Sequence, residues 1–196
     1  RNRKVELISD LKEALQNKGI LFTMIMFFLI QVCVMLLQPL ITMYVGQLMG
    51  QVNDEAVQMA GVIFSLAGIS GILAAPFWGK RGQQYGYVKT FCYITLGAGV
   101  VNLLQFFTTD VYQFAVVQFI YGLFLAGAIP NINANLAEVT DKSIRGKAFG
   151  LVTSAQMSGG FVGPLLGGAL GYFLPTKLVI ISTGIILISV AGYTYL

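Results

Sequence analysis

The 196-residue chain has the length of a single soluble domain, but its composition excludes one. Charged residues make up 10% of the chain, against about 25% in soluble domains, and the mean hydropathy is +0.77. Because so few charges cannot cover a globular surface, we expect an integral membrane protein. The sequence has no His, which excludes a histidine triad, an imidazole metal site and a histidine pH switch. No metal or cofactor is expected.

The chain is expected to have two parts, a charged lead-in over residues 1–19 and an apolar bundle over residues 20–196. In the lead-in, apolar residues recur at helical spacing among charged ones, which predicts a short amphipathic linker helix at the cytoplasmic membrane surface. These apolar residues are Val5, Ile8, Leu11 and Leu15. A charged linker without regular structure is the alternative.

Six stretches of the bundle are long enough to cross a bilayer, since a membrane-spanning helix needs about 20 mostly apolar residues. They cover approximately residues 20–46, 56–77, 90–108, 111–137, 148–174 and 178–196, and no charged residue falls inside them. The short connections carry polar or turn-forming residues. The sequence therefore predicts an all-α polytopic membrane protein with six transmembrane helices.

The positive charges are distributed unevenly among the connections. All but one of the 12 Lys and Arg residues precede the first span or lie in the second and fourth loops; the exception is Lys177 in the fifth loop. Loops rich in Lys and Arg stay on the cytoplasmic side of the membrane. We therefore expect a multi-pass protein of the cell membrane (inner or plasma membrane) with both termini cytoplasmic.

Two ten-residue segments share residues at matching positions. Ser70–Gly79 in the second span and Ser158–Gly167 in the fifth share their Ser, the following Gly, a Pro at the seventh position and the final Gly. The two spans run in opposite directions but hold the same place in each set of three. This favours a 3+3 inverted repeat, a recurring construction in transporters.

The second loop, over residues 79–89, and the fifth span both carry glycine-containing motifs. In the loop, Gly79 and Gly86 lie seven residues apart. This spacing resembles the Gly-x-x-x-Asp-Arg-x-Gly-Arg-Lys motif of the major facilitator superfamily, although Gln83 and Gln84 replace its Asp and Arg. Gly159-x-x-x-Gly163-Pro164-x-x-Gly167-Gly168 is similar to the family's antiporter motif. The resemblance assigns conformational roles to Gly79, Gly86, Arg145, Gly159, Gly163, Pro164, Gly167 and Gly168. An ordinary positively charged loop and a static seam of small residues are the alternative interpretations.

A transporter of this superfamily has twelve spans in two halves, so the resemblance implies one half of a twelve-helix fold. The degenerate loop motif, the amphipathic lead-in and the start at Arg1 without an initiator Met favour the C-terminal half. The antiporter-like motif argues for the N-terminal half instead. On the favoured interpretation, the partner of this chain is a missing N-terminal six-helix half.

Polar, aromatic and Met side chains within the spans are the candidate substrate contacts, because polar groups inside a membrane tend to face a cavity or a partner. The candidates are Phe27, Gln31, Met35, Gln38, Gln118, Tyr121, Phe124, Asn131 and Gln156. Such side chains form an adaptable surface for lipophilic or cationic molecules. Packing between helices and contact with lipid are the alternatives for each of them.

The resemblance implies a secondary active transporter, and proton-coupled drug efflux by alternating access is the favoured activity. Uptake of a sugar or other metabolite and a membrane scaffold without transport are the alternatives. No Asp or Glu lies deep in a span, so protons would be carried by the other half. The expected partners are the lipid bilayer and a small-molecule substrate, with no nucleic acid. Without His, paired carboxylates or an exposed nucleophile, an enzyme is not expected.

Overall fold

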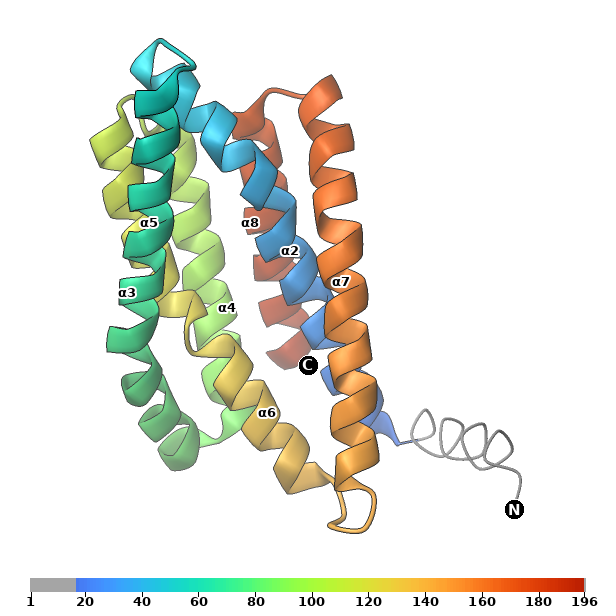
Figure 1. The fold of residues 1–196 in the computed structure, drawn as a ribbon. Helices are drawn as coiled ribbons and strands as arrows, with labels where there is room; N and C mark the ends of the chain where they lie inside the picture. The colour runs from blue at the N-terminus through green and yellow to red at the C-terminus, as the bar shows by residue number, and fades with distance from the viewer. Residues whose placement is uncertain (1–16, 196) are drawn as a thin grey trace.

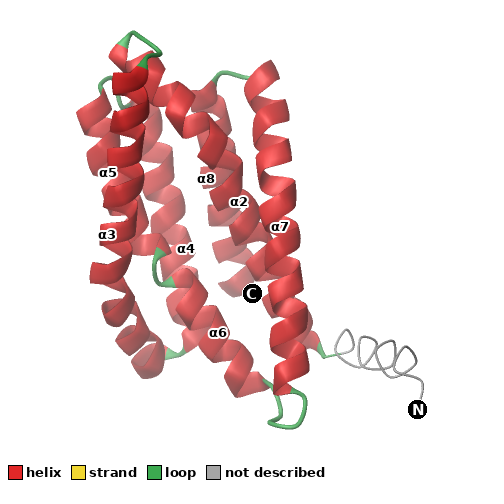
Figure 2. Ribbon diagram, in the orientation of Figure 1, coloured by secondary structure: helices red, strands yellow, loops and turns green. Residues whose placement is uncertain are grey.

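The structure is a computed structural model that describes residues 17–195, so the linker helix predicted over residues 1–19 lies almost entirely outside the described residues. The described part of the chain is helical and contains no strand (Figures 1 and 2). Its elements are α2 (Lys18–Met49), α3 (Asp54–Tyr85), α4 (Tyr87–Leu104), the 3-10 turn η1 (Gln105–Phe107), α5 (Val111–Leu125), α6 (Ala128–Val139), α7 (Arg145–Phe173) and α8 (Thr176–Tyr195).

Polar residues in the connections begin the helices that follow them. The Oδ1 atom of Asn17 accepts hydrogen bonds from the backbone N–H groups of the first turn of α2. Asn53 caps α3 in the same way, and Asp110 accepts from Tyr112 at 2.6 Å at the start of α5. At the other end of α2, Gly50 adopts φ 72°, a left-handed conformation that commonly terminates a helix.

The helices form one antiparallel bundle with six crossings, because α5 and α6 together make one crossing (Figure 1). Among the described residues, five segments are long and apolar enough to span a membrane, with Val111–Val139 counted as one segment. The remaining crossing, α7, is 29 residues long but rich in Gly and Ser. It lies beside α2 in the bundle, and its length of about 44 Å is sufficient to cross a bilayer.

The helix pairs follow the symmetry expected of an inverted repeat. The main pairs are α2 with α7, α4 with α8 and α3 with α5. Exchanging the first three crossings for the last three converts the α2–α7 pair into the pair of α5 with α3. The same exchange leaves the α4–α8 pair unchanged. The packing therefore has the pairing pattern of the 3+3 arrangement that the two matching segments predict.

Two predicted boundaries are corrected by the structure. The second loop is not a loop over residues 79–89, because α3 continues through Gly79 to Tyr85 and only Gly86 separates it from α4. Gly86 has φ 93°, which L side chains rarely adopt, so it makes the turn alone. Gly79 is helical and does not participate in the turn.

The fourth span, predicted over residues 111–137, consists of two helices, with a break between α5 and α6. Pro130 has no N–H to donate to the carbonyl of Ala126, so the regular hydrogen-bonding pattern is interrupted there. Gly127 lies at the break, packed so closely that a Cβ atom there would be 2.5 Å from Trp78 Cβ. The break therefore lets α6 approach α3 next to the only Trp of the chain.

The positive charges of the described residues lie at the ends of the bundle. The start of α2, the α3–α4 turn and the α6–α7 connection share one end, at the bottom of Figure 1. Lys18, Lys80, Arg81, Lys89, Lys142, Arg145 and Lys147 belong to this end, and Lys177 to the opposite end. The fold thus places the charge asymmetry of the sequence along the axis of the bundle.

Candidate functional site

A cavity of about 490 Å³ opens between α2, α3, α5, α6 and α7. Among the described residues, no charged side chain lines it. Six of the nine predicted substrate contacts do line it: Gln31, Met35, Gln38, Gln118, Tyr121 and Gln156. The cavity also includes an α3 wall of Phe64, Ala67 and Gly71, which the sequence analysis missed. Their spacing of three and four residues marks one helix face, but nothing in an apolar stripe distinguishes a cavity wall from packing.

Amide side chains provide the hydrogen-bonding groups of this cavity. Gln156 on α7 donates to Gln31 on α2, with 3.4 Å between Nε2 and Oε1, so these two amides join neighbouring helices of the cavity wall. Gln118 on α5 accepts a shorter bond of 2.8 Å from Gln105, which belongs to the 3-10 turn after α4. Gln38 is exposed on α2. The cavity therefore presents neutral donors and acceptors on an otherwise apolar surface.

Tyr121 connects the cavity to the packed interior. Its side chain lines the cavity and also packs in a buried cluster with Cys33, Ala98 and Leu187. Its Oη atom is buried without a hydrogen-bond partner among the described residues. The aromatic body of Tyr121 is therefore shared between the cavity wall and this buried cluster.

The other three predicted contacts do not line this cavity. Phe27 is 2% exposed and belongs to a core cluster that includes Ile94 and Ile132. Phe124 packs against Trp78, with ring centroids 5.8 Å apart. Both rings point toward neighbouring helices because those sides of α2 and α5 pack against other elements of the bundle.

Asn131 connects α6 to α3 through a hydrogen bond and does not line the cavity. Its Nδ2 atom donates to the carbonyl of Gly127 at 2.8 Å and to that of Trp78 at 3.3 Å. Its Oδ1 atom lies so close to Gly82 that a Cβ atom there would collide with it. Asn131 is 1% exposed, so its polarity serves contact between helices.

The glycines of the antiporter-like motif form a seam against α2. A Cβ atom on Gly159 would lie 2.6 Å from the carbonyl oxygen of Phe28, and one on Gly163 would lie 2.7 Å from Met35 Cβ. A Cβ atom on Gly167 would collide with the carbonyl of Leu36. Such close approach of backbones is the usual consequence of small residues spaced four apart in membrane helices.

Gly168 and Pro164 differ from the seam glycines because both are exposed, and a Cβ atom on Gly168 would meet nothing within 4 Å. Helix α7 runs through Pro164 without interruption. Arg145 begins the same helix and donates through Nη2 to the carbonyls of Ala137, at 2.6 Å, and Thr140, at 3.4 Å. It thereby ties the end of α6 to the start of α7.

Two further amides, Asn102 and Gln105, lie near the end of α4 that is opposite the α3–α4 turn. Asn102 on α4 donates to Thr183 Oγ1 at 2.7 Å and to the carbonyl of Ile180 on α8. Gln105 reaches Gln118 as described above. Thus Asn102 joins two helices, whereas Gln105 supports a cavity-lining side chain. Within the described residues, no group of three or more His, Cys, Asp or Glu side chains is placed to hold a metal ion.

Comparison with known proteins identifies the family. The Major Facilitator Superfamily sequence profile matches residues 20–196. Multidrug resistance protein MdtG of Yersinia enterocolitica is 33% identical over 136 residues, which cover 69% of this chain and 32% of that relative. MdtG of Escherichia coli O1:K1 / APEC is 32% identical over the same length, covering 33% of the relative. The matched region thus spans about a third of each relative's length.

Proposed function

Because the chain belongs to the major facilitator superfamily, we propose that it forms the C-terminal six-helix half of a proton-coupled exporter of lipophilic or cationic drugs. The observation that carries this proposal is the uncharged cavity, in which amide, Met and aromatic side chains share one surface. The multidrug resistance proteins among its relatives support the same substrate class.

The cavity favours shape-tolerant recognition. Its volume of about 490 Å³ falls within the range of small-molecule sites, roughly 300–1,000 Å³. Met35 can adapt its side chain to different ligands, and Gln31, Gln38 and Gln156 can each donate or accept a hydrogen bond. A sugar site would need more numerous fixed hydrogen-bonding groups than this surface offers, which favours drugs over the uptake alternative.

Proton coupling requires a titrating group that this cavity does not contain. Within the described residues, the carboxylates Asp54, Glu55, Asp110, Glu138 and Asp141 lie at or near helix ends, away from the cavity lining. We assign the proton-carrying carboxylate to the N-terminal half, which pairs with this chain to complete the transporter. The chain then contributes to substrate binding and to movement, with no catalytic role.

Alternating access would rock this bundle against the other half about the shared cavity. The glycine seam keeps α7 close to α2, and Pro164 on the exposed side of α7 is the proposed point of bending. In the proposed orientation, both termini and the end rich in Lys and Arg face the cytoplasm of a cell-membrane transporter.

The test uses the complete transporter, expressed in a strain that lacks its own drug exporters. Gln31→Ala removes a cavity amide that makes one long hydrogen bond, 3.4 Å, to Gln156 among the described side chains. We expect drug resistance to fall about fivefold, equivalent to the loss of one hydrogen bond to the substrate. Gln113→Ala, an exposed glutamine on α5 outside the cavity, is the matched control and should leave resistance unchanged. Protein abundance is compared by immunoblotting.

Resistance that is unchanged in Gln31→Ala at normal abundance would contradict the assignment of this cavity. Substrate-dependent accumulation of a radiolabelled sugar in energised vesicles, without any drug export, would establish the uptake alternative instead.

A further inference from the structure

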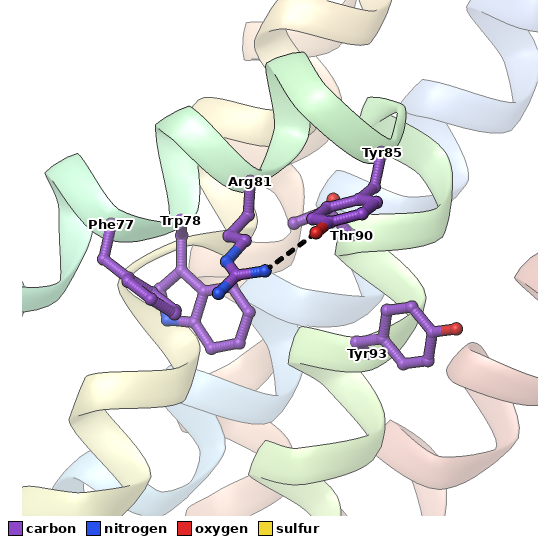
Figure 3. Close-up of a pocket in the computed structure, with 6 residues that line it drawn as sticks. All are labelled: Phe77, Trp78, Arg81, Tyr85, Thr90 and Tyr93. Atoms are coloured by element: carbon purple, nitrogen blue, oxygen red, sulfur yellow. Dashed lines mark hydrogen bonds between the residues drawn. The ribbon is translucent and has the colours of Figure 1, made fainter.

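A second pocket lies at the end of the bundle that is rich in Lys and Arg. Its volume is about 400 Å³, and it is lined by Phe77, Trp78, Arg81 and Tyr85 of α3 and by Thr90 and Tyr93 of α4 (Figure 3). Helix α4 contributes no residue to the central cavity, so this groove is a separate site. Phe77, Tyr85 and Tyr93 are each more than half exposed.

Arg81 is held in this pocket by aromatic rings. Its guanidinium carbon lies 5.2 Å from the centroid of the Phe77 ring and 5.4 Å from that of Tyr85, both within cation–π range. Its Nη1 atom also donates to the Tyr85 hydroxyl at 3.2 Å, the dashed line in Figure 3. No carboxylate of the described residues forms an ion pair with it. A guanidinium has five N–H donors, so a positioned cation with unused donors faces the pocket.

The surroundings of Arg81 add positive potential. Lys80 and Lys89 flank the α3–α4 turn, and residues 79–89 contain no Asp or Glu. Helix α4 starts immediately after the turn without a side-chain cap, so its first N–H groups add to the positive field. A planar guanidinium in this field is well suited to bind two oxygens of one phosphate.

The depth of the pocket suits a lipid headgroup. Arg81 lies four residues before the end of α3, about 6 Å along the helix axis. Trp and Tyr side chains gather at the interface between membrane and water, and Trp78, Tyr85 and Tyr93 surround this site. In the orientation proposed above, the pocket meets the cytoplasmic leaflet, where anionic lipids are attracted by basic residues.

We propose that this pocket binds the phosphate headgroup of an anionic phospholipid. Arg81 contacts the phosphate oxygens, and the exposed rings of Phe77 and Tyr93 contact the glycerol and the upper acyl chains. The argument depends on the geometry of α3 and α4 and on the proposed orientation, and not on which substrate the transporter carries.

Trp78 provides the readout, because it lines the pocket and is the only Trp of the chain. The chain is reconstituted in vesicles that contain phosphatidylglycerol or phosphatidylcholine with brominated acyl chains, which quench a nearby indole. In a longer polypeptide carrying this chain, other tryptophans are replaced by phenylalanine. Brominated lipid is present in both leaflets, so the result does not depend on orientation and needs no transport.

The wild-type chain should reach half-maximal quenching at a mole fraction of brominated phosphatidylglycerol several-fold lower than that of brominated phosphatidylcholine. Arg81→Gln should abolish this preference, and Arg81→Lys, which keeps the charge but loses the planar fork, should retain part of it. Lys80→Gln is the matched control, since Lys80 is exposed and outside the pocket. It should keep the preference. Circular dichroism checks that each variant folds.

Equal quenching by the two lipids in the wild-type chain would overturn the proposal. So would an equal loss of preference in Lys80→Gln and Arg81→Gln, because general charge attraction would then explain it. Inorganic phosphate at 10 mM should not reverse quenching by phosphatidylglycerol. Complete reversal would identify a site for a free phosphate anion and overturn the lipid assignment.

Discussion

Arg145 shows how one side chain can complete a helix end. The last carbonyls of a helix have no backbone N–H donor from a following turn. At the end of α6, the Arg145 guanidinium donates instead to the carbonyls of Ala137 and Thr140. Its Nε atom is buried and has no hydrogen-bond partner among the described residues. The loop resemblance predicted a conformational role for Arg145, and the hydrogen bonds supply a physical basis for one.

We expect Arg145→Ala to lower the free energy of unfolding by about 1.5–3 kcal/mol, because it removes charged hydrogen bonds and leaves carbonyls unpaired. Thermal unfolding in detergent, followed by circular dichroism, measures the change. Lys142→Ala is the control, since Lys142 is an exposed cation in the same connection. Equal melting temperatures for the two variants would show that the contacts of Arg145 contribute no stability.

At the scale of the elements, the seam between α7 and α2 explains why glycines follow one another at intervals of four. Each seam glycine meets the backbone or Cβ of α2, whereas Gly168, one residue after Gly167, faces open space. Helix α7 therefore contains three glycines that close packing on α2 requires, whereas packing within this bundle does not require Gly168.

Gly163→Ala and Gly168→Ala test this distinction with identical chemistry. At Gly163 the added methyl group would lie 2.7 Å from Met35 Cβ, so we expect a loss of about 1–3 kcal/mol through overpacking. At Gly168 the added methyl group meets nothing, so a gain of up to about 1 kcal/mol from helix propensity is expected. Unfolding in mixed micelles compares both variants with the wild type. Equal effects at the two positions would refute the seam.

The sequence predicted the number and order of the crossings, because apolar runs separated by Asn53, Asp110 and similar residues report spans and caps directly. It did not predict that α3 continues past Gly79, since glycine lowers helix propensity without excluding a helix. Helical spacing also grouped Asn131 and Phe124 with the cavity residues. Spacing defines a face of one helix, but which neighbour covers that face depends on the break before Pro130 and on the position of Trp78.

At the scale of the whole molecule, the fold separates charge along the axis of the bundle. Lys177 stands alone among the described cations at its end, where its Nζ atom donates to the carbonyl of Thr108 at 3.1 Å and lies over the Phe106 ring. These contacts stabilise the Lys177 side chain at the end of the bundle opposite the Lys- and Arg-rich end. The proposed topology of the transporter depends on this separation.

Cysteine labelling in intact cells tests the proposed topology. In a background without Cys33 and Cys92, Thr109→Cys should react with a membrane-impermeant maleimide from outside. Lys142→Cys should react only after the membrane is permeabilised. Both positions are exposed in the bundle, so a difference in their labelling reports which side of the membrane each one faces. The reverse pattern would place the termini outside and contradict the orientation on which the lipid site depends.

The pairing of α2 with α7 also determines when the bundle can close during synthesis. Gln31 and Gln156, which meet across this pair, are separated by 125 residues. At ribosomal rates of roughly 5–20 residues per second, α2 waits about 6–25 s for its partner. Until then, the face of α2 that receives Gly159 and Gly163 lacks its partner helix. A nascent chain that stops before Gly159 therefore leaves this face of α2 without α7, and a chain that extends past Phe173 can cover it.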